Sequence, residues 1–261
     1  MKRVVPVALA ALAAIALSAG PATARTPAQA NPDPTVATTP GDATTPTTTA
    51  TVTLTDVQLA ATGVIDPSDL PESWTSSAPD VKQDRIRLKV ASKTSGCDDF
   101  VEFATANAAT TTATSNGYAS GTGAHIDNHV YVHESKADAT AAMDAFATTS
   151  VPGCLSKVLA TSLRRSVARD KEASASITDV TLKMQPVDMR GLGVPTVAYQ
   201  GGLAITLRDG TRQDAALGLV AVQVGRVIVT YSFLAPSAST DLEPALAGAL
   251  NGTLSRVYSV G

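Results

Sequence analysis

The feature that most restricts the fold is a long apolar run from residue 215 to residue 234. Gln223, Gly225 and Arg226 interrupt it. Its β-branched residues favour two buried strands joined by a tight turn rather than a membrane helix. Because both faces of such strands are apolar, other layers must cover the sheet on both sides. The run therefore predicts two neighbouring strands inside a layered domain.

Other segments alternate between strand and helix patterns. Further strands are expected at 108–120, with a turn at Asn116-Gly117, and at 125–133, 175–185 and 195–208. Asp209-Gly210 predicts a hairpin turn before the apolar run. Helices are expected from a Ser135 cap to about 149, from 154 to 168 after a break at Pro152-Gly153, and after a cap at Thr240 or Asp241. The pattern predicts an α+β fold, a largely antiparallel β-sheet flanked by α-helices.

The first 24 residues have the zones of a secretory signal peptide. Lys2 and Arg3 precede an apolar stretch, residues 4–19, that is short for a membrane span of about 20 residues. Ala22-Thr23-Ala24 is a small-x-small cleavage pattern, so we expect cleavage after Ala24. Pro21 stands where a lipoprotein would need a cysteine. The alternative is an uncleaved N-terminal anchor.

Residues 25–55 are rich in Thr, Ala and Pro. Such a segment has almost nothing large to bury, so we expect a disordered tail. It is either a spacer or a spacer that carries O-linked sugars on its Thr-Pro clusters. The globular domain is expected to span residues 56–261.

The charge of the mature chain restricts its partners. Cleavage removes two of the 20 basic residues and none of the 23 acidic ones, which leaves a net charge of −5. Nucleic-acid binders concentrate positive charge, so no nucleic-acid partner is expected. We expect a secreted, extracellular protein, free or associated with the cell wall, with no stable membrane span after signal cleavage.

Cys97 and Cys154 are the only cysteines. An even pair in an exported chain indicates a disulfide, because the compartment is oxidising. Closing a loop of this length stabilises the fold by about 4 kcal/mol in the chain-entropy account. The alternative, a redox or metal-binding pair, is disfavoured because there is no C-x-x-C spacing. No cofactor or metal is expected.

Several of these residues together resemble a known family. Asp69-Leu70-Pro71 and Trp74 open the domain, the two cysteines bracket two predicted strands and a helix, and a Val/Ile-rich hairpin precedes the last helix. This arrangement resembles the extracellular sensor domain family typified by mycobacterial serine/threonine protein kinase H, which also occurs as free-standing exported actinobacterial proteins. The resemblance implies an antiparallel sheet flanked by helices and a cleft for an unidentified ligand. This chain departs from that kinase in two ways. It has no cysteines for the second disulfide of the kinase, and it contains neither a kinase domain nor an internal membrane helix.

The strand 125–133 carries every histidine of the chain on one side. His125, Asp127, His129, Tyr131 and His133 alternate with Ile126, Val130 and Val132. Residues four apart on a strand are about 13 Å from each other, too far to share a zinc ion. Two interpretations remain for this side: a solvated polar face, which we favour, or the wall of a ligand cleft. In a cleft, the histidines would make binding depend on pH.

The second predicted helix carries a row of positive charge formed by Lys157, Arg164, Arg165 and Arg169. Such a row is typical of the solvated face of an amphipathic helix, the interpretation we favour. The alternative is a docking site for an anionic wall polymer or lipid head group.

Gly248 and Gly252 lie four residues apart on the predicted last helix. This spacing occurs in membrane helix dimers, but the flanking residues are not those of a membrane span. We expect the two glycines to allow close packing of this helix on the sheet.

No catalytic motif is present, because the chain lacks a G-x-S-x-G elbow and no cysteine is expected to be free. We expect a secreted, non-catalytic, sensor-like domain of the cell envelope that binds a small molecule or a wall component. Two alternatives stay open. One is an envelope protein–protein interaction module, and the other is an envelope hydrolase that depends on His129 or His133. The sequence leaves the ligand and the oligomeric state open.

Overall fold

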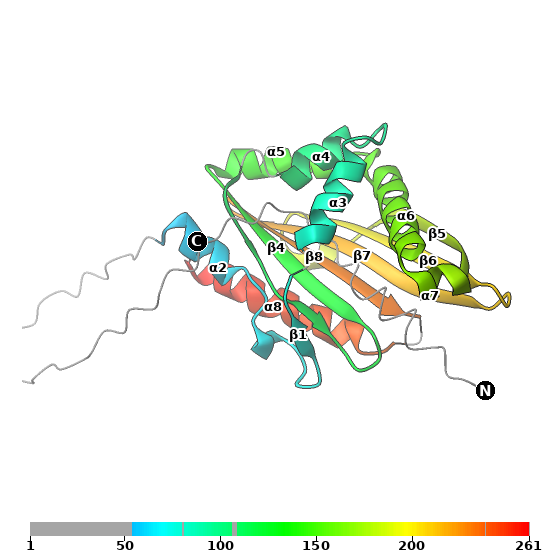
Figure 1. Cartoon of the computed structure of the whole chain (residues 1–261). Coiled ribbons are helices and arrows are strands. Elements are labelled where there is room, and N and C mark those ends of the chain that lie inside the picture. The colour runs from blue at the N-terminus through cyan, green and yellow to red at the C-terminus, as the bar shows by residue number, and fades with distance from the viewer. Residues whose placement is uncertain (1–53, 80, 106–108, 238, 261) are drawn as a thin grey trace, which may run out of the picture.

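The computed structural model describes residues 54–79, 81–105, 109–237 and 239–260, and within these the side chains of 81–84 and 190 are left out. This part of the chain forms an eight-stranded sheet with helices on both faces (Figure 1). The strand order is β1-β3-β4-β8-β7-β6-β5, β2 also pairs with β4, and all pairs are antiparallel. The predicted fold class is confirmed.

The strands are β1 (Thr75–Ser77), β2 (Ala109–Thr114), β3 (Gly117–Ala119), β4 (His125–His133), β5 (Ile177–Val187), β6 (Thr196–Leu207), β7 (Arg212–Val224) and β8 (Val227–Pro236). The helices are α2 (Asp56–Thr62), α3 (Val81–Ala91), α4 (Asp98–Thr105), α5 (Lys136–Phe146), α6 (Val151–Arg169), α7 (Lys171–Ser176) and α8 (Leu242–Val260). Two short 3-10 turns are η1 (Pro67–Asp69) and η2 (Arg190–Leu192).

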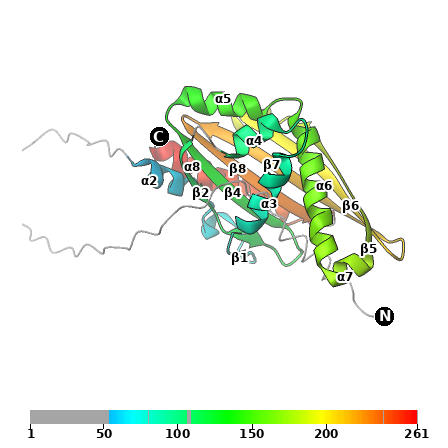
Figure 2. The same ribbon diagram turned by 45° about the horizontal axis from the view of Figure 1, so that its top comes forward.

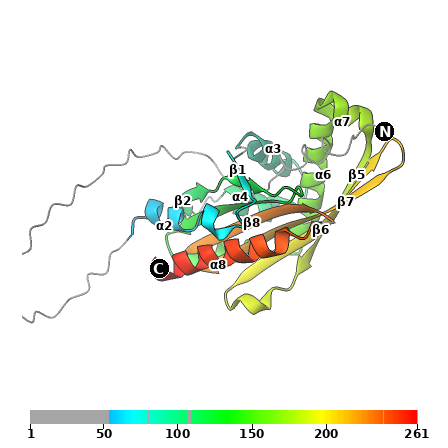
Figure 3. The same ribbon diagram turned by 90° about the horizontal axis from the view of Figure 1, so that it is seen from below.

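The predicted central hairpin is formed by β7 and β8, which Gly225 joins in the left-handed conformation (φ 57°). Its side chains divide between two apolar cores, one on each face of the sheet. Helices α3 to α6 cover one face, and α2, η1 and α8 cover the other, as Figure 3 shows from below. The sheet is therefore covered on both sides, as the apolar run predicts. No helix within the described ranges is long and apolar enough to cross a bilayer.

Two local predictions are wrong in an informative way. Asn116-Gly117 is not a turn but the irregular step between β2 and β3, which both pair with β4. There Ser115 exchanges hydrogen bonds with the backbone of Asn128. Pro152 and Gly153 do not break a helix but lie in the first turn of α6, where a proline costs no hydrogen bond.

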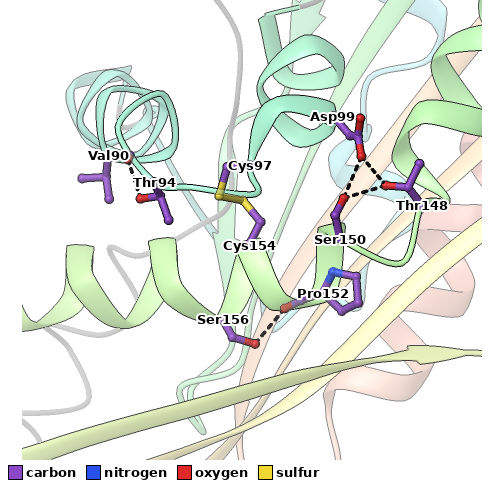
Figure 4. Close-up of a disulfide and its surroundings, with 9 residues drawn as sticks. All are labelled: Val90, Thr94, Cys97, Asp99, Thr148, Ser150, Pro152, Cys154 and Ser156. Carbon is purple, nitrogen blue, oxygen red and sulfur yellow. Dashed lines mark hydrogen bonds between the residues drawn. A yellow bond between two sulfur atoms is a disulfide. The ribbon is translucent and has the colours of Figure 1, made fainter.

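The disulfide between Cys97 and Cys154 is confirmed, although it does not cross the sheet. It joins the residue before α4 to α6, within one helical layer (Figure 4). Beside it, the Asp99 carboxylate accepts hydrogen bonds from the hydroxyls of Thr148 (2.8 Å) and Ser150 (2.7 Å). The start of α4 is thus held to the start of α6 by a covalent bond and by two hydrogen bonds.

Helix α8 is clamped to the start of the domain. The guanidinium of Arg256 donates to both carboxylate oxygens of Asp69 (2.8 and 2.7 Å) and to the carbonyl oxygens of Thr62 and Val64. Gly248 and Gly252 make room for this contact, because a Cβ there would lie 2.2 Å from the Asp69 carbonyl oxygen and 2.0 Å from its Oδ1. The two glycines therefore pack closely against η1, not against the sheet as expected.

Helix α6 closes the outer edge of β5. Arg164 donates a hydrogen bond to the carbonyl oxygen of Val180 (2.7 Å), and the backbone N–H of Met184 donates to the Ser156 hydroxyl (2.8 Å). Pro186, on the same strand, has no N–H to offer. Exposed edge strands are sites of unwanted pairing, and these side chains protect this one.

Candidate functional site

The histidine-bearing side of β4 is buried. Every residue of β4 is buried, including the alternating polar set His125, Asp127, His129 and His133. The alternation itself is confirmed, because Ile126, Val130 and Val132 lie in the opposite core. The favoured interpretation of a solvated face is wrong, because helices cover both faces of β4.

Helix α3 lies over this side of the sheet (Figure 2) and contributes the positively charged Arg87. The guanidinium-bearing side chain of Arg87 is only 5% exposed, and its positive charge acts on His125, Asp127 and His129. On the sheet, β4 is paired with β8 so that Ser232 lies opposite Asp127 and Thr230 opposite His129. We call Arg87, His125, Asp127, His129, Thr230 and Ser232 the polar cluster.

Asp127 is the most constrained member of the polar cluster. It is 3% exposed, and its Oδ1 accepts a short hydrogen bond from the hydroxyl of Ser232. Its Oδ2 has no hydrogen-bond partner among the described residues and lies 3.9 Å from Nδ1 of His125. One carboxylate oxygen is therefore buried without the bond that such an atom normally makes.

His129 shows the same incomplete pairing. Its Nδ1 shares a hydrogen bond of 3.0 Å with the hydroxyl of Thr114 on β2, whereas its Nε2 has no partner among the described residues. The ring is 3% exposed. Since an unpaired buried polar atom costs about 1–3 kcal/mol, two of them on one side of one strand are unusual.

The other two residues of the predicted set are placed differently. Tyr131 packs in the apolar core, with its ring centroid 5.8 Å from that of Phe103 on α4. His133 ends β4, where its backbone pairs with that of Arg226. The structure thus gathers His125, Asp127 and His129 under α3 and leaves Tyr131 to the hydrophobic packing.

Burial moves the pKa of each ionisable group in the polar cluster. Burial, with a smaller effect of the Arg87 charge, lowers the pKa of His125 to about 4 and that of His129 to about 3. Burial raises the pKa of Asp127 to about 6, although the Ser232 hydrogen bond and Arg87 oppose the rise. At neutral pH the site therefore contains two uncharged imidazoles, a carboxylate and a guanidinium.

This arrangement suits hydrogen bonding better than catalysis or metal binding. No group of three or more His, Cys, Asp or Glu side chains in the described ranges is arranged to hold a metal ion. A histidine with a pKa of about 3 or 4 is a weak base at neutral pH, where an effective general base has a pKa near 7. Both cysteines are in the disulfide and are not available as nucleophiles.

The cationic side chains of α6 do not form a site with the polar cluster. Lys157, Arg165 and Arg169 are exposed on α6, and Arg164, also exposed, is engaged with β5. Exposure of these four residues fits a solvated helix face. Anion docking at this helix stays a prediction.

Sequence reasoning missed three members of the polar cluster. Thr230 and Ser232 alternate with apolar residues along β8, and this period of two was a readable signal for a polar stripe. Arg87 gave no such signal, because it lies in a segment rich in charge that resembles any solvated helix. Only the packing of α3 on the sheet shows that this arginine is buried.

Comparison with known proteins adds a distant likeness. No protein-family model matches the chain, and no curated protein matches it. Among solved structures, the extracellular domain of PknH from Mycobacterium tuberculosis is similar over 79% of this chain and 93% of its own, at 10% identity and a TM-score of 0.36. The chain therefore has a distant structural resemblance to that extracellular domain.

Proposed function

We propose that this chain is an exported, non-catalytic binding domain of the cell envelope, and that its ligand binds to the polar cluster beneath α3. The observation that carries the proposal is the pair of buried, unpartnered atoms Asp127 Oδ2 and His129 Nε2. Buried polar groups with strongly shifted pKa values gather at functional sites more often than elsewhere. A ligand that hydrogen-bonds to both atoms recovers the free energy that their burial costs.

The ligand reaches the site by displacement of α3. This helix packs on the polar cluster through Arg87, although Val90 and Ala91 near its end are in the apolar core. A contact with buried polar groups is weaker than the apolar contact of α8, which the Arg256–Asp69 ion pair also clamps. Movement of α3 therefore requires less free energy than movement of α8, and it uncovers His125, Asp127 and His129 together.

Hydrolysis is the catalytic alternative, and the contact between Thr114 and His129 is its best support. A hydroxyl nucleophile needs a base that takes its proton and a third group that orients the base. The low pKa of His129 and its unpartnered Nε2 leave both requirements unmet within the described residues. We therefore propose a binding role.

A thermal-shift screen at pH 7 with envelope lipids, glycans and metabolites tests the proposal. We expect at least one compound to raise Tm in the wild-type protein and to lose that effect in Asp127→Asn and His129→Phe variants. Asp98→Asn makes the same chemical change on an exposed side chain of α4 and should keep the full shift. A screen without any shift, or a shift that survives both cluster variants, contradicts the proposal.

Export is tested separately by the mass and N-terminal sequence of the protein recovered outside the cells that express it. We expect a chain that begins at Arg25 and contains the Cys97–Cys154 disulfide. Protein that stays inside the cell with Met1 intact contradicts export but leaves the binding site untouched.

A further inference from the structure

A groove lies on the sheet face opposite α6, away from the polar cluster. It has a volume of about 680 Å³, within the range of small-ligand sites, and crosses β5, β6 and β7. Its floor is formed by Gly202 and Ala204 of β6 and by Ala216 of β7, which pairs with Gly202. The polar side chains around this floor are Thr181, Lys183, Gln185, Gln200, Arg212, Asp214 and Ser237.

Strand β6 contains two consecutive glycines, and packing within the fold requires only the first of them. At Gly201, on the other face, a Cβ would lie 2.5 Å from Sδ of Met184 and 2.6 Å from the Lys183 carbonyl oxygen, so packing requires a glycine. At Gly202 a Cβ would meet nothing within 4 Å, and the backbone is not in the left-handed region. A glycine inside a strand costs stability and often marks the close approach of a ligand or of another backbone. No contact within the described structure explains Gly202, whereas an occupant of the groove would.

The polar groups around the floor are arranged in rows by the strand register. Lys183 lies directly beside Gly202, and no carboxylate of the described residues is within ion-pair distance of it. Gln185 and Gln200 lie side by side in the next row. In the row on the other side, Asp214 lies beside Ala204, and one of its carboxylate oxygens accepts a hydrogen bond of 2.8 Å from Arg212.

This arrangement presents a positive and a negative group on opposite sides of an open floor. Lys183 and Asp214 are two strands apart, and their positions along the strands differ by two residues. With strands about 4.8 Å apart and a rise of about 3.3 Å per residue, their Cα atoms are about 12 Å apart. An extended peptide advances about 3.4 Å per residue, so three or four residues span this distance. The amides of Gln185 and Gln200 lie in the row beyond Lys183, and since they both donate and accept hydrogen bonds they would meet the end of such a peptide that lies at Lys183.

We propose that this groove is a second binding site, which takes a short extended peptide with free termini. The peptide carboxylate lies at Lys183, its ammonium group lies at Asp214, and its backbone crosses Gly202. A neutral glycan would also satisfy the amides, but it would leave Lys183 without a partner of opposite charge.

Isothermal titration calorimetry with trialanine tests this proposal. We expect trialanine to bind with a dissociation constant below about 1 mM, and trialanine amide and N-acetyl-trialanine to bind at least about tenfold more weakly, because each lacks one charge. Lys183→Gln should remove the difference between trialanine and its amide. Chitotriose is the neutral sugar probe and should give no heat.

Gly202→Val provides the decisive variant, because it fills the groove with a residue that favours strands and meets no neighbour at its Cβ. It should fold with wild-type or higher Tm and lose trialanine binding. Gly153→Val, at another glycine in open space, should bind as the wild type does. Absence of heat from trialanine, binding that survives Gly202→Val, or binding of chitotriose alone overturns the proposal. None of these results bears on the polar cluster, which lies on the opposite face of the sheet.

Discussion

Two helices cover opposite faces of the same strands, and they do so by different physical means. Helix α8 rests on an apolar core and is held by Arg256, whose guanidinium is bonded to Asp69 and to two carbonyl oxygens. Helix α3 rests on the polar cluster, where Asp127 and His129 each leave an atom unpaired within the described structure. The comparison teaches that an apolar core and an ion-pair clamp hold one cover, whereas the other rests on buried polar groups, and we expect the second cover to open more readily.

The largest expected effect comes from the covalent bond on the α3 side. A variant with both Cys97→Ser and Cys154→Ser should lose about 4 kcal/mol of unfolding free energy, because the bond closes a loop of 57 residues in the unfolded chain. Urea unfolding measures the loss. Hydrogen exchange should show faster opening of α3 and α4 while α8 keeps most of its protection. Equal loosening of α8 would contradict the contrast between the two covers.

A slightly smaller effect is expected when the clamp of α8 is broken. In Gly252→Ala the new methyl group would lie 2.0 Å from Oδ1 of Asp69, so the ion pair with Arg256 must separate. Breaking a partly buried pair of this kind should lower the free energy of unfolding by about 3 kcal/mol. Gly153→Ala, where a Cβ meets nothing, is the matched control and should be neutral or stabilising. A loss no larger than that of the control would mean that the clamp contributes little.

Acid should weaken the α3 side selectively. Because the pKa values of His125 and His129 are depressed in the folded state, the unfolded chain takes up protons first as the pH falls below 6.5. Asp127, whose pKa is raised to about 6, acts in the opposite direction between pH 6 and pH 4. Two histidines outweigh one carboxyl group, so the free energy of unfolding should fall by about 2–3 kcal/mol from pH 6.5 to pH 4.

Chemical denaturation at a series of pH values measures this loss. A variant with His125→Gln and His129→Gln should show a much flatter profile over the same range. An unchanged slope in that variant would place the acid sensitivity elsewhere in the chain.

The smallest effect is a gain in stability. Asp127→Asn keeps an oxygen that accepts the Ser232 hydrogen bond but removes a buried charge. At pH 8, where the carboxyl group is ionised, the variant should be about 1 kcal/mol more stable than the wild type, and at pH 4 the gain should vanish. Binding sites often cost stability in this way. Lower stability of the variant at pH 8 would show that the charge of Asp127 holds the fold together.

The sequence predicts the sheet well because its strands carry strong local patterns. The bounds of β4 follow from strict alternation, and the β6–β7 hairpin follows from Asp209-Gly210. Helices α2, α3 and α4 were not predicted. In α4 the helical spacing of Phe100, Phe103 and Ala104 was a readable signal, whereas α3 shows no clear apolar period. The N-terminal signal and nearly all of the predicted tail lie outside the described residues. Within that tail, only Leu54 and the α2 cap Thr55 are described.

The candidate site was predicted only in part, for a physical reason. Alternation assigns His125, Asp127 and His129 to one side of a strand, but it does not say which layer covers that side. Burial of the three depends on α3 and Arg87, which come from a distant part of the chain. A polar side chain on a strand is usually solvated, so the local pattern favoured the wrong interpretation.

The closed edge of β5 has a consequence for how copies of this chain can meet. With Arg164 and Ser156 on its outward backbone groups, that rim cannot readily serve as a template for the strand of a neighbouring copy. Neighbouring molecules are therefore not expected to extend the sheet by pairing strands along this edge. Each copy would then stay separate, with its groove still open to the solvent.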